Sequence, residues 1–112
     1  MDQEQSIQQI SVFELNEKML KKEAFYLLDV RTREEKLIAD IGGQLIPVNE
    51  VEERFSELHG REDLDIIIYC HHGMRSCHAC SLFKEKGFKR VFNLRGGIDQ
   101  WSLQIDNSIS RY

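Results

Sequence analysis

The chain has 112 residues, of which 41% are hydrophobic and 30% charged, and its formal net charge is −4 at pH 7. This length suits one compact domain over residues 1–112, with a core at about 7–105, and excludes a second catalytic domain. Basic and acidic residues are interleaved and no apolar run approaches the ~18 residues of a membrane helix, so we expect neither nucleic acid nor a membrane as a partner.

The first ten residues carry acidic and amide groups where an export signal needs a basic start and an apolar stretch. We therefore expect a cytoplasmic protein. The chain has three cysteines, an odd number that does not suit a disulfide framework, and the cytoplasm keeps thiols reduced. A free and reactive thiol is the natural expectation.

The first half of the chain predicts a helix, a strand and an irregular segment. Ser11 and Glu14 form a capping box, and apolar residues with helical spacing follow up to about Lys22. The run FYLLDV at 25–30 lacks alternation, which predicts a central strand buried on both faces. The segment 31–47 begins with charged residues and ends with the only proline, so we expect a short helical turn, a loop and a brief strand there.

The second half alternates between helices and strands. Residues 49–59 predict an amphipathic helix, and DLDIIIYC at 63–70 is the strongest strand candidate because its isoleucines favour strands. Further expected elements are a loop at 71–75, a helix ending at Gly87 and a strand at 90–94. A short helix starting in GGIDQW and a loose polar tail at 106–112 are expected to follow. The alternation predicts an α/β fold with a mainly parallel sheet of about five strands.

Cys70 lies where the strongest strand turns toward a helix, and sites in open α/β sheets form beyond the carboxyl ends of strands. A glycine in the turn allows a tight bend, and Ser76 can sit at the start of the helix. Backbone N–H groups and the positive helix end converge there, which favours the thiolate, the nucleophilic form. We expect Cys70 to carry a persulfide, with positive charge from Arg75, His71 and His72 attracting a small anionic sulfur donor.

The stretch YCHHGMRSCHA resembles the active-site loop of single-domain rhodaneses, whose common form is Cys-x-x-Gly-x-Arg-Ser after a strand. FYLLDVRTREE and VFNLRGGIDQW resemble two further stretches of that family, and the likeness covers roughly residues 7–105. It implies a thiosulfate sulfurtransferase without a cofactor, in which catalytic Cys70 passes sulfur to cyanide, a thiol or a sulfur-relay protein. Asp29 and Arg31 would help to hold the loop. The implied substrate-binding loop consists of His71, His72, Gly73, Met74, Arg75 and Ser76.

One stretch departs from the family. In IADIGGQLIP at 38–47, Asp40 replaces a histidine, Gly42 replaces the first proline, and one residue is missing. We expect the loop beside the active site to have a different shape, which leaves the physiological donor open.

Several side chains have a structural interpretation. Cys77 and Cys80 are expected to pack in the core, with a redox or relay role as the alternative. Six cysteines and histidines crowd into positions 70–80, but no second paired cluster completes a zinc site, so we expect no metal. His59 and His78 are expected at the surface, Trp101 in the core, and the RTREEK run, with Arg33 and Lys36, on a solvated helix face. A structural salt bridge is favoured over substrate contact for Asp29 and Arg31.

Two other functions compete with sulfur transfer. A cysteine phosphatase or arsenate reductase of the same fold needs a longer Cys-x5-Arg loop, whereas only four residues separate Cys70 from Arg75. The shorter loop better fits a single sulfur on the thiol. The other rival is a noncatalytic or redox-sensing rhodanese-like module that binds partners. The intact cysteine argues against an inactive domain but leaves a sensor possible.

Overall fold

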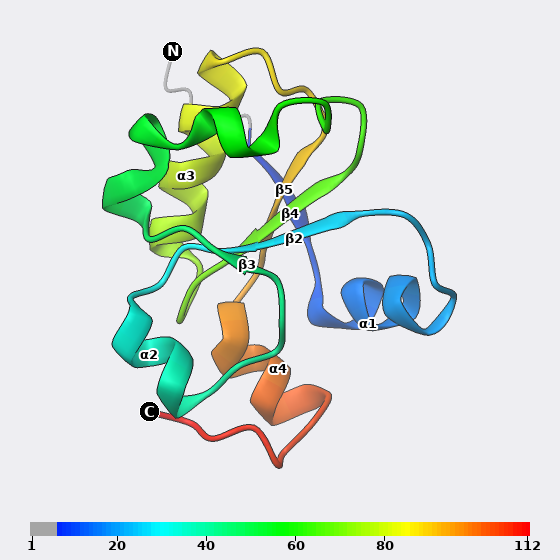
Figure 1. The fold of residues 1–112 in the computed structure, drawn as a ribbon. Helices are drawn as coiled ribbons and strands as arrows, with labels where there is room; N and C mark the ends of the chain where they lie inside the picture. The colour runs from blue at the N-terminus through cyan, green and yellow to red at the C-terminus, as the bar shows by residue number, and fades with distance from the viewer. Residues whose placement is uncertain (1–6) are drawn as a thin grey trace.

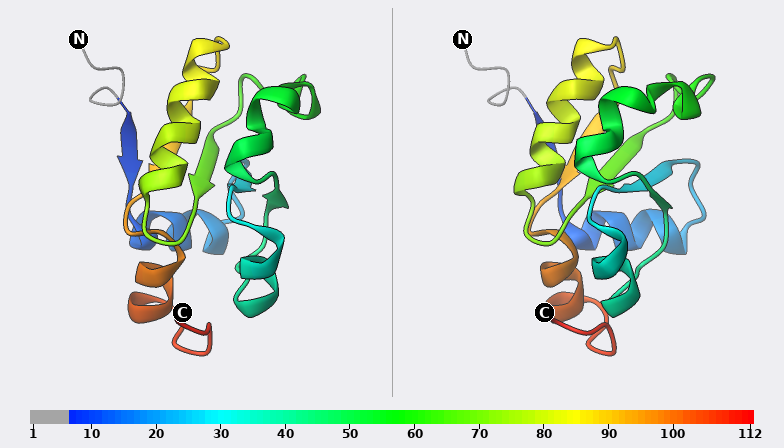
Figure 2. Two further views of the ribbon diagram at one scale, coloured as in Figure 1. Left: turned by 90° about the vertical axis from the view of Figure 1, so that its left-hand side faces the viewer. Right: turned by 60° about the vertical axis from the view of Figure 1, so that its left-hand side comes forward.

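A parallel sheet forms the centre of the molecule, with helices on both faces (Figures 1 and 2). The computed structural model describes residues 7–112, so residues 1–6, on which the export prediction partly rests, lie outside it. The sheet has five strands in the order β1-β5-β4-β2-β3, and all four pairings are parallel. This confirms the predicted α/β fold. Within residues 7–112, no helix is long and apolar enough to cross a membrane.

The elements follow one another with short connections. The strands are β1 (Gln8–Ile10), β2 (Tyr26–Asp29), β3 (Gln44–Leu45), β4 (Ile66–Tyr69) and β5 (Val91–Leu94). The helices are α1 (Val12–Leu20), α2 (Arg33–Ile38), α3 (Met74–Glu85) and α4 (Gly97–Gln104), together with the 3-10 helices η2 (Val48–Glu53) and η3 (Phe55–Leu58). The predicted capping box of Ser11 and Glu14 starts α1.

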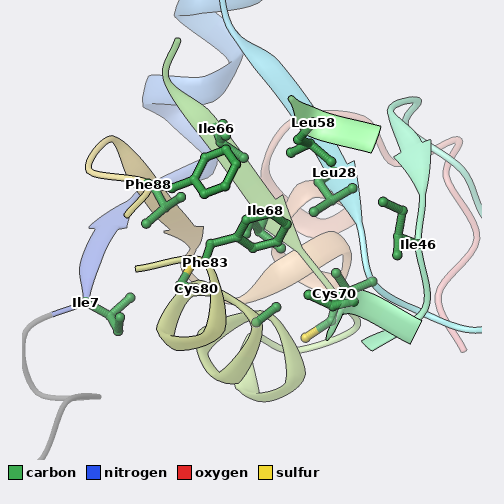
Figure 3. Close-up of a cluster of buried hydrophobic side chains, with 14 residues drawn as sticks. Ile7, Leu28, Ile46, Leu58, Ile66, Ile68, Cys70, Cys80, Phe83 and Phe88 are labelled. Atoms are coloured by element: carbon green, nitrogen blue, oxygen red, sulfur yellow. The ribbon is translucent and has the colours of Figure 1, made fainter. Parts of the chain in front are cut away.

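Alternate residues of β4 build the two halves of the core. Ile66 and Ile68 face α3 and the 3-10 helices, and Cys70 continues this row beyond the end of the strand (Figure 3). Ile67 and Tyr69 face the other way, toward α1 and α4. All five side chains are at most 1% exposed. Burial on both faces is the property that the unbroken apolar run predicted.

The expected helix over 49–59 is replaced by two 3-10 helices. Val51 and Leu58, whose spacing predicted one amphipathic helix, are both buried, but the chain bends between them at Arg54, where φ is −121°. Short 3-10 segments are close in energy to a short α-helix, so packing decides between them. Apolar spacing alone therefore predicted the buried residues correctly and the helix type wrongly.

Strand β1 was not predicted, because it has only three residues and only Ile10 among them is buried. The expectation of a loose tail at 106–112 was wrong as well. Ile109 packs against the core on the α1 and α4 side, and its carbonyl accepts a hydrogen bond from Ser102 Oγ at 2.6 Å. Arg111 Nε donates to Asp99 of α4 at 2.9 Å. Figure 2 shows the end of this segment close to α2 and α4, at the carboxyl edge of the sheet.

Candidate active site

The loop that follows β4 is a tight turn into α3. Gly73 is the N-cap residue of α3 with a φ of 112°, a left-handed conformation that favours glycine. Helix α3 therefore begins at Met74. The expected loop at 71–75 would have placed its first residue at Ser76, two residues later. The predicted helix-starting role of Ser76 was wrong, because this residue is already the third of the helix and caps nothing.

The sulfur of Cys70 is the point on which the loop converges. Sγ accepts from the backbone N–H of Gly73 at 3.1 Å and from the N–H of Ser76 at 3.4 Å, and the hydroxyl oxygen of Ser76 lies 3.3 Å away. Cys70 is 1% exposed and lies at the N-terminal end of α3, whose dipole favours negative charge. The two N–H groups and the end of the helix thus favour a negatively charged group at this position.

The first turn of α4 fixes the backbone of the loop. The N–H of Ile98 donates to the carbonyl of Cys70 at 2.9 Å, and that of Asp99 to the carbonyl of His71 at 3.1 Å. A Cβ on Gly97 would lie 2.5 Å from the Cys70 oxygen and 2.4 Å from the His71 oxygen, so only glycine permits this approach. Gly97, the first residue of α4, therefore allows the start of this helix to bind the loop of Cys70 directly.

Asn93 of β5 holds the loop through hydrogen bonds to Ser76 and Gly73. The sequence analysis did not identify this residue. Its Oδ1 accepts a short hydrogen bond from Ser76 Oγ, and its Nδ2 donates to the Gly73 carbonyl at 3.1 Å and to Gln9 at 3.0 Å. Asn93 is 4% exposed. A polar residue inside the apolar strand VFNL was the available signal, because buried amides need partners.

Arg75 does not stand free for an anionic donor. Its guanidinium binds both carboxylate oxygens of Glu35 in α2, at 2.6 and 2.9 Å. Glu35 also accepts from the hydroxyl of Tyr112 at 2.8 Å and from the backbone of Thr32 at the start of α2. The bond from Arg75 and these further donors hold the pKa of Glu35 well below its usual range. Glu35 lies in the RTREEK run that was interpreted as a solvated helix face, so the sequence reasoning missed its role.

Asp29 and Arg31 form a salt bridge that is completely buried, with both side chains 0% exposed. Arg31 Nε and Nη2 donate to the two carboxylate oxygens of Asp29 at 2.9 and 2.8 Å. Arg31 Nη1 donates to the hydroxyl of Tyr112 at 2.9 Å. Arg31 Nη1 also donates to the carbonyl of Glu35 at 3.3 Å, so the pair is connected to the loop of Cys70 through Glu35 and Tyr112.

The two loop histidines differ in their surroundings. His72 is largely exposed, whereas the ring of His71 stacks on His72 and on Tyr112 with centroid distances of 3.9 Å. Burial lowers the pKa of His71, and the neighbouring His72 lowers it further. His71 is therefore mostly neutral at pH 7, which differs from the partial positive charge expected from the sequence.

The remaining polar side chains of the region form no evident metal centre. In residues 7–112, potential ligand atoms of His71, His72 and Asp99 lie within 4.8 Å of one another. Asp99 is already bound by Arg111, and the two imidazole planes are only 23° apart, so their lone pairs do not converge on one ion. We assign no metal site to these residues.

The other predicted structural residues lie largely as expected. Cys80 is completely buried, and burial raises its pKa so that it stays a thiol. Cys77 is partly buried and lines a cavity of about 440 Å³ beside the loop, between Met74 and Arg95. Trp101 is buried in the core. His59 and His78 are both exposed.

The chain is similar to known proteins over most of its length. The sequence model of the family described as Rhodanese-like domain matches residues 12–104. The chain is 41% identical over 98 residues to a Bacillus subtilis protein named as a candidate sulfur carrier protein, YrkF, and the match covers 87% of this chain and 52% of that protein. It is 35% identical over 97 residues to an Allochromatium vinosum protein named sulfurtransferase, with 86% of this chain and 89% of that protein covered.

The same similarity extends to solved structures. Reduced CoADR-RHD of Bacillus anthracis matches with a TM-score of 0.80 and 31% identity, over 92% of this chain and 18% of that one. The chain thus spans about half of the YrkF protein and a smaller part of CoADR-RHD, but most of the Allochromatium vinosum protein.

Proposed function

The chain belongs to the rhodanese-like domain family, and from this premise we propose that it is a sulfurtransferase that carries sulfur as a persulfide on Cys70. The observation that carries the proposal is the convergence of two backbone N–H donors, from Gly73 and Ser76, on Sγ of Cys70 at the N-terminal end of α3. Convergent donors stabilise a thiolate and, after reaction, a persulfide anion. The names of the Bacillus subtilis and Allochromatium vinosum relatives support the same chemistry.

The proposed cycle has two displacement steps. In the first, the Cys70 thiolate attacks the outer sulfur of a donor such as thiosulfate, the S–S bond of the donor breaks, and sulfite leaves with the electron pair. In the second, an acceptor such as cyanide or a thiolate attacks the outer sulfur of the persulfide, and Cys70 leaves as the thiolate. Protein thiols of a sulfur relay are acceptors of the same chemical class. No cofactor takes part in either step.

The supporting residues act on the loop rather than on the donor. Arg75 is held by Glu35, and Asp29 and Arg31 are buried together, so we assign all of these side chains to positioning the loop. Small anions are then bound by backbone N–H groups and the end of α3, within residues 70–76. We also propose that the whole chain forms a single domain and that the protein works in the cytoplasm.

Phosphoryl transfer fits this site less well than sulfur transfer. The N–H groups of Gly73 and Ser76 point at Sγ itself, at 3.1 and 3.4 Å. A phosphatase loop instead has to surround the oxygens of a tetrahedral anion beyond the sulfur. These donors are therefore placed to bind a single sulfur and not the oxygens of a tetrahedral anion. The short spacing between Cys70 and Arg75 agrees with this.

Intact-mass analysis tests the proposal. After exposure to thiosulfate and removal of the excess, the native protein should gain the mass of one sulfur, and cyanide should remove it. Peptide mapping should place the added sulfur on Cys70. A protein that stays unmodified with thiosulfate and with polysulfide, or one that instead hydrolyses aryl phosphates in a Cys70-dependent way, would contradict the assignment.

A further inference from the structure

One side chain of the Cys70 loop has a polar atom without a partner. Nε2 of His71 is the only buried side-chain nitrogen or oxygen in residues 7–112 that makes no hydrogen bond. Buried polar atoms are almost always paired, so an unpaired one calls for a partner that arrives during function. His71 directly follows Cys70, and its backbone is fixed by α4.

The chain around His71 fixes the plane of the imidazole and leaves Nε2 buried without a partner. The ring stacks on Tyr112 with an interplanar angle of 9° and on His72 with an angle of 23°. Nε2 has no hydrogen-bond partner within the described residues. In the neutral imidazole one ring nitrogen carries the proton and the other keeps a lone pair, and we infer that the unpaired Nε2 is the nitrogen with the lone pair.

The other bases around the loop are already engaged. Three carboxylates of the neighbouring elements each accept hydrogen bonds from an arginine, namely Glu35 of α2, Asp99 of α4 and Asp29 of β2. The imidazole of His72 is 63% exposed and lies 3.8 Å from Asp99. Among the described residues around the loop, His71 is therefore the base whose ring nitrogen has no hydrogen-bond partner and is shielded from solvent.

We propose that His71 is a catalytic base for the second half-reaction, in which Nε2 takes the proton of an acceptor thiol, a step that rests on the sulfurtransferase function proposed above. The acceptor thiolate attacks the outer sulfur of the Cys70 persulfide, the S–S bond breaks, and Cys70 leaves as the thiolate. The acceptor becomes a persulfide, and the proton on His71 returns to solvent. No oxidant or reductant is needed. The physiological acceptor is accordingly a thiol and not a proton-free anion.

The charge state of His71 suits this role. Burial lowers its pKa below the usual value and the neighbouring His72 lowers it further, while Glu35, Asp99 and the backbone of Tyr112 act in the opposite direction. A neutral imidazole at pH 7 is the form that accepts a proton. The rings of Tyr112 and His72 both cover the imidazole and are both exposed, at 36% and 63%, so an incoming thiol reaches Nε2 when one of these two rings moves aside.

Single-turnover discharge of the persulfide tests this inference. The full chain is loaded with thiosulfate or polysulfide, and loss of sulfur to 2-mercaptoethanol or to sulfite is followed by intact mass. His71→Gln removes the base, and His78→Gln, at an exposed position of α3, is the matched control. With the thiol we expect His71→Gln to react about 100-fold more slowly, at the low end of the ~10²–10⁴ typical of general bases. With sulfite at mildly alkaline pH, which has no proton to lose, both variants should keep the native rate.

The pH dependence separates the mechanisms further. With His71 as base, the native rate with the thiol should be nearly constant from neutral to mildly alkaline pH, whereas His71→Gln should gain about tenfold per pH unit, as the thiolate fraction does. Equal rates in the two proteins, or equal slowing with thiol and sulfite, would overturn the proposal. If His71→Gln does not fold, a tenfold rise per unit in the native protein overturns it and a plateau supports it. A native protein that never gains sulfur overturns the proposed function, and this inference with it.

Discussion

Replacing Asp29 by asparagine should destabilise the fold by about 3–5 kcal/mol, the usual cost of breaking a buried ion pair. The carboxylate is 0% exposed and accepts from Arg31 Nε and Nη2, from the Arg31 backbone N–H and from the hydroxyl of Tyr69. Without it, the guanidinium of Arg31 stays buried with only neutral partners, including the carbonyl of Ala39 and the hydroxyl of Tyr112. The size of the effect comes from this uncompensated charge.

Equilibrium unfolding in urea measures the effect. A domain of this kind has a total stability of about 5–15 kcal/mol, so the expected loss is a large fraction of it. Glu50→Gln is the matched control, because Glu50 also pairs with arginine side chains, those of Arg33 and Arg54, but does so near the surface, where water replaces the lost contacts. Its unfolding midpoint should stay near that of the native protein.

Two results would refute the reasoning about Asp29. A loss below about 1 kcal/mol, the range of surface pairs, would mean that the charge of Arg31 is not buried. Native stability together with abolished sulfur transfer would mean that Asp29 contacts the substrate, the alternative to a structural salt bridge. The double variant Asp29→Leu with Arg31→Met should recover part of the stability, because it removes both charges.

Three further predictions concern the loop. Cys70→Ser should abolish sulfur transfer while the unfolding midpoint stays near native, because serine keeps the size but forms no persulfide; transfer to cyanide by this variant would move the chemistry elsewhere. Glu35→Gln should destabilise the protein most above about pH 4.5, the ordinary pKa of a glutamate, because the pKa of Glu35 is lowered in the folded protein. As the pH falls below this value, protonation of Glu35 removes its pairing with Arg75, so the difference in urea midpoint between the variant and the native protein should shrink. At mildly acidic pH, iodoacetamide should label Cys70 before Cys77 and Cys80, as peptide mapping can show; equal labelling would contradict a stabilised thiolate.

Local signals predicted the parts of the fold that local physics determines. The isoleucines of β4 have no polar alternation, and they lie in the centre of the sheet with both faces covered. The capping box at Ser11 starts α1 because the side chains that satisfy the helix end are three residues apart. Cys70 could be singled out because the end of a parallel strand and the following helix are both visible in the sequence.

The supports of the site could not be predicted, because they join residues far apart in the chain. Ser76 and Asn93 are 17 residues apart, Glu35 and Arg75 are 40 apart, and Glu35 and Tyr112 are 77 apart. Charged and amide side chains in a sequence indicate only that partners are needed and not which ones. The polarity of RTREEK and of NSISRY predicted exposure, which most of these side chains have, but it did not predict that Glu35 pairs with Arg75 and Tyr112 beside the loop.

The misread tail and the misread charge of His71 have one physical cause. A loose tail would leave His71 in water, where an imidazole has its ordinary pKa and carries partial charge at pH 7. The packed tail instead places the ring of Tyr112 on His71. Burial of the imidazole lowers its pKa and favours the neutral form, although the backbone of Tyr112 acts in the opposite direction. The residue that sequence reasoning assigned to attracting an anion is therefore better suited to taking a proton. Burial of the imidazole, to which His72 contributes a further lowering of the pKa, decides between these two chemistries.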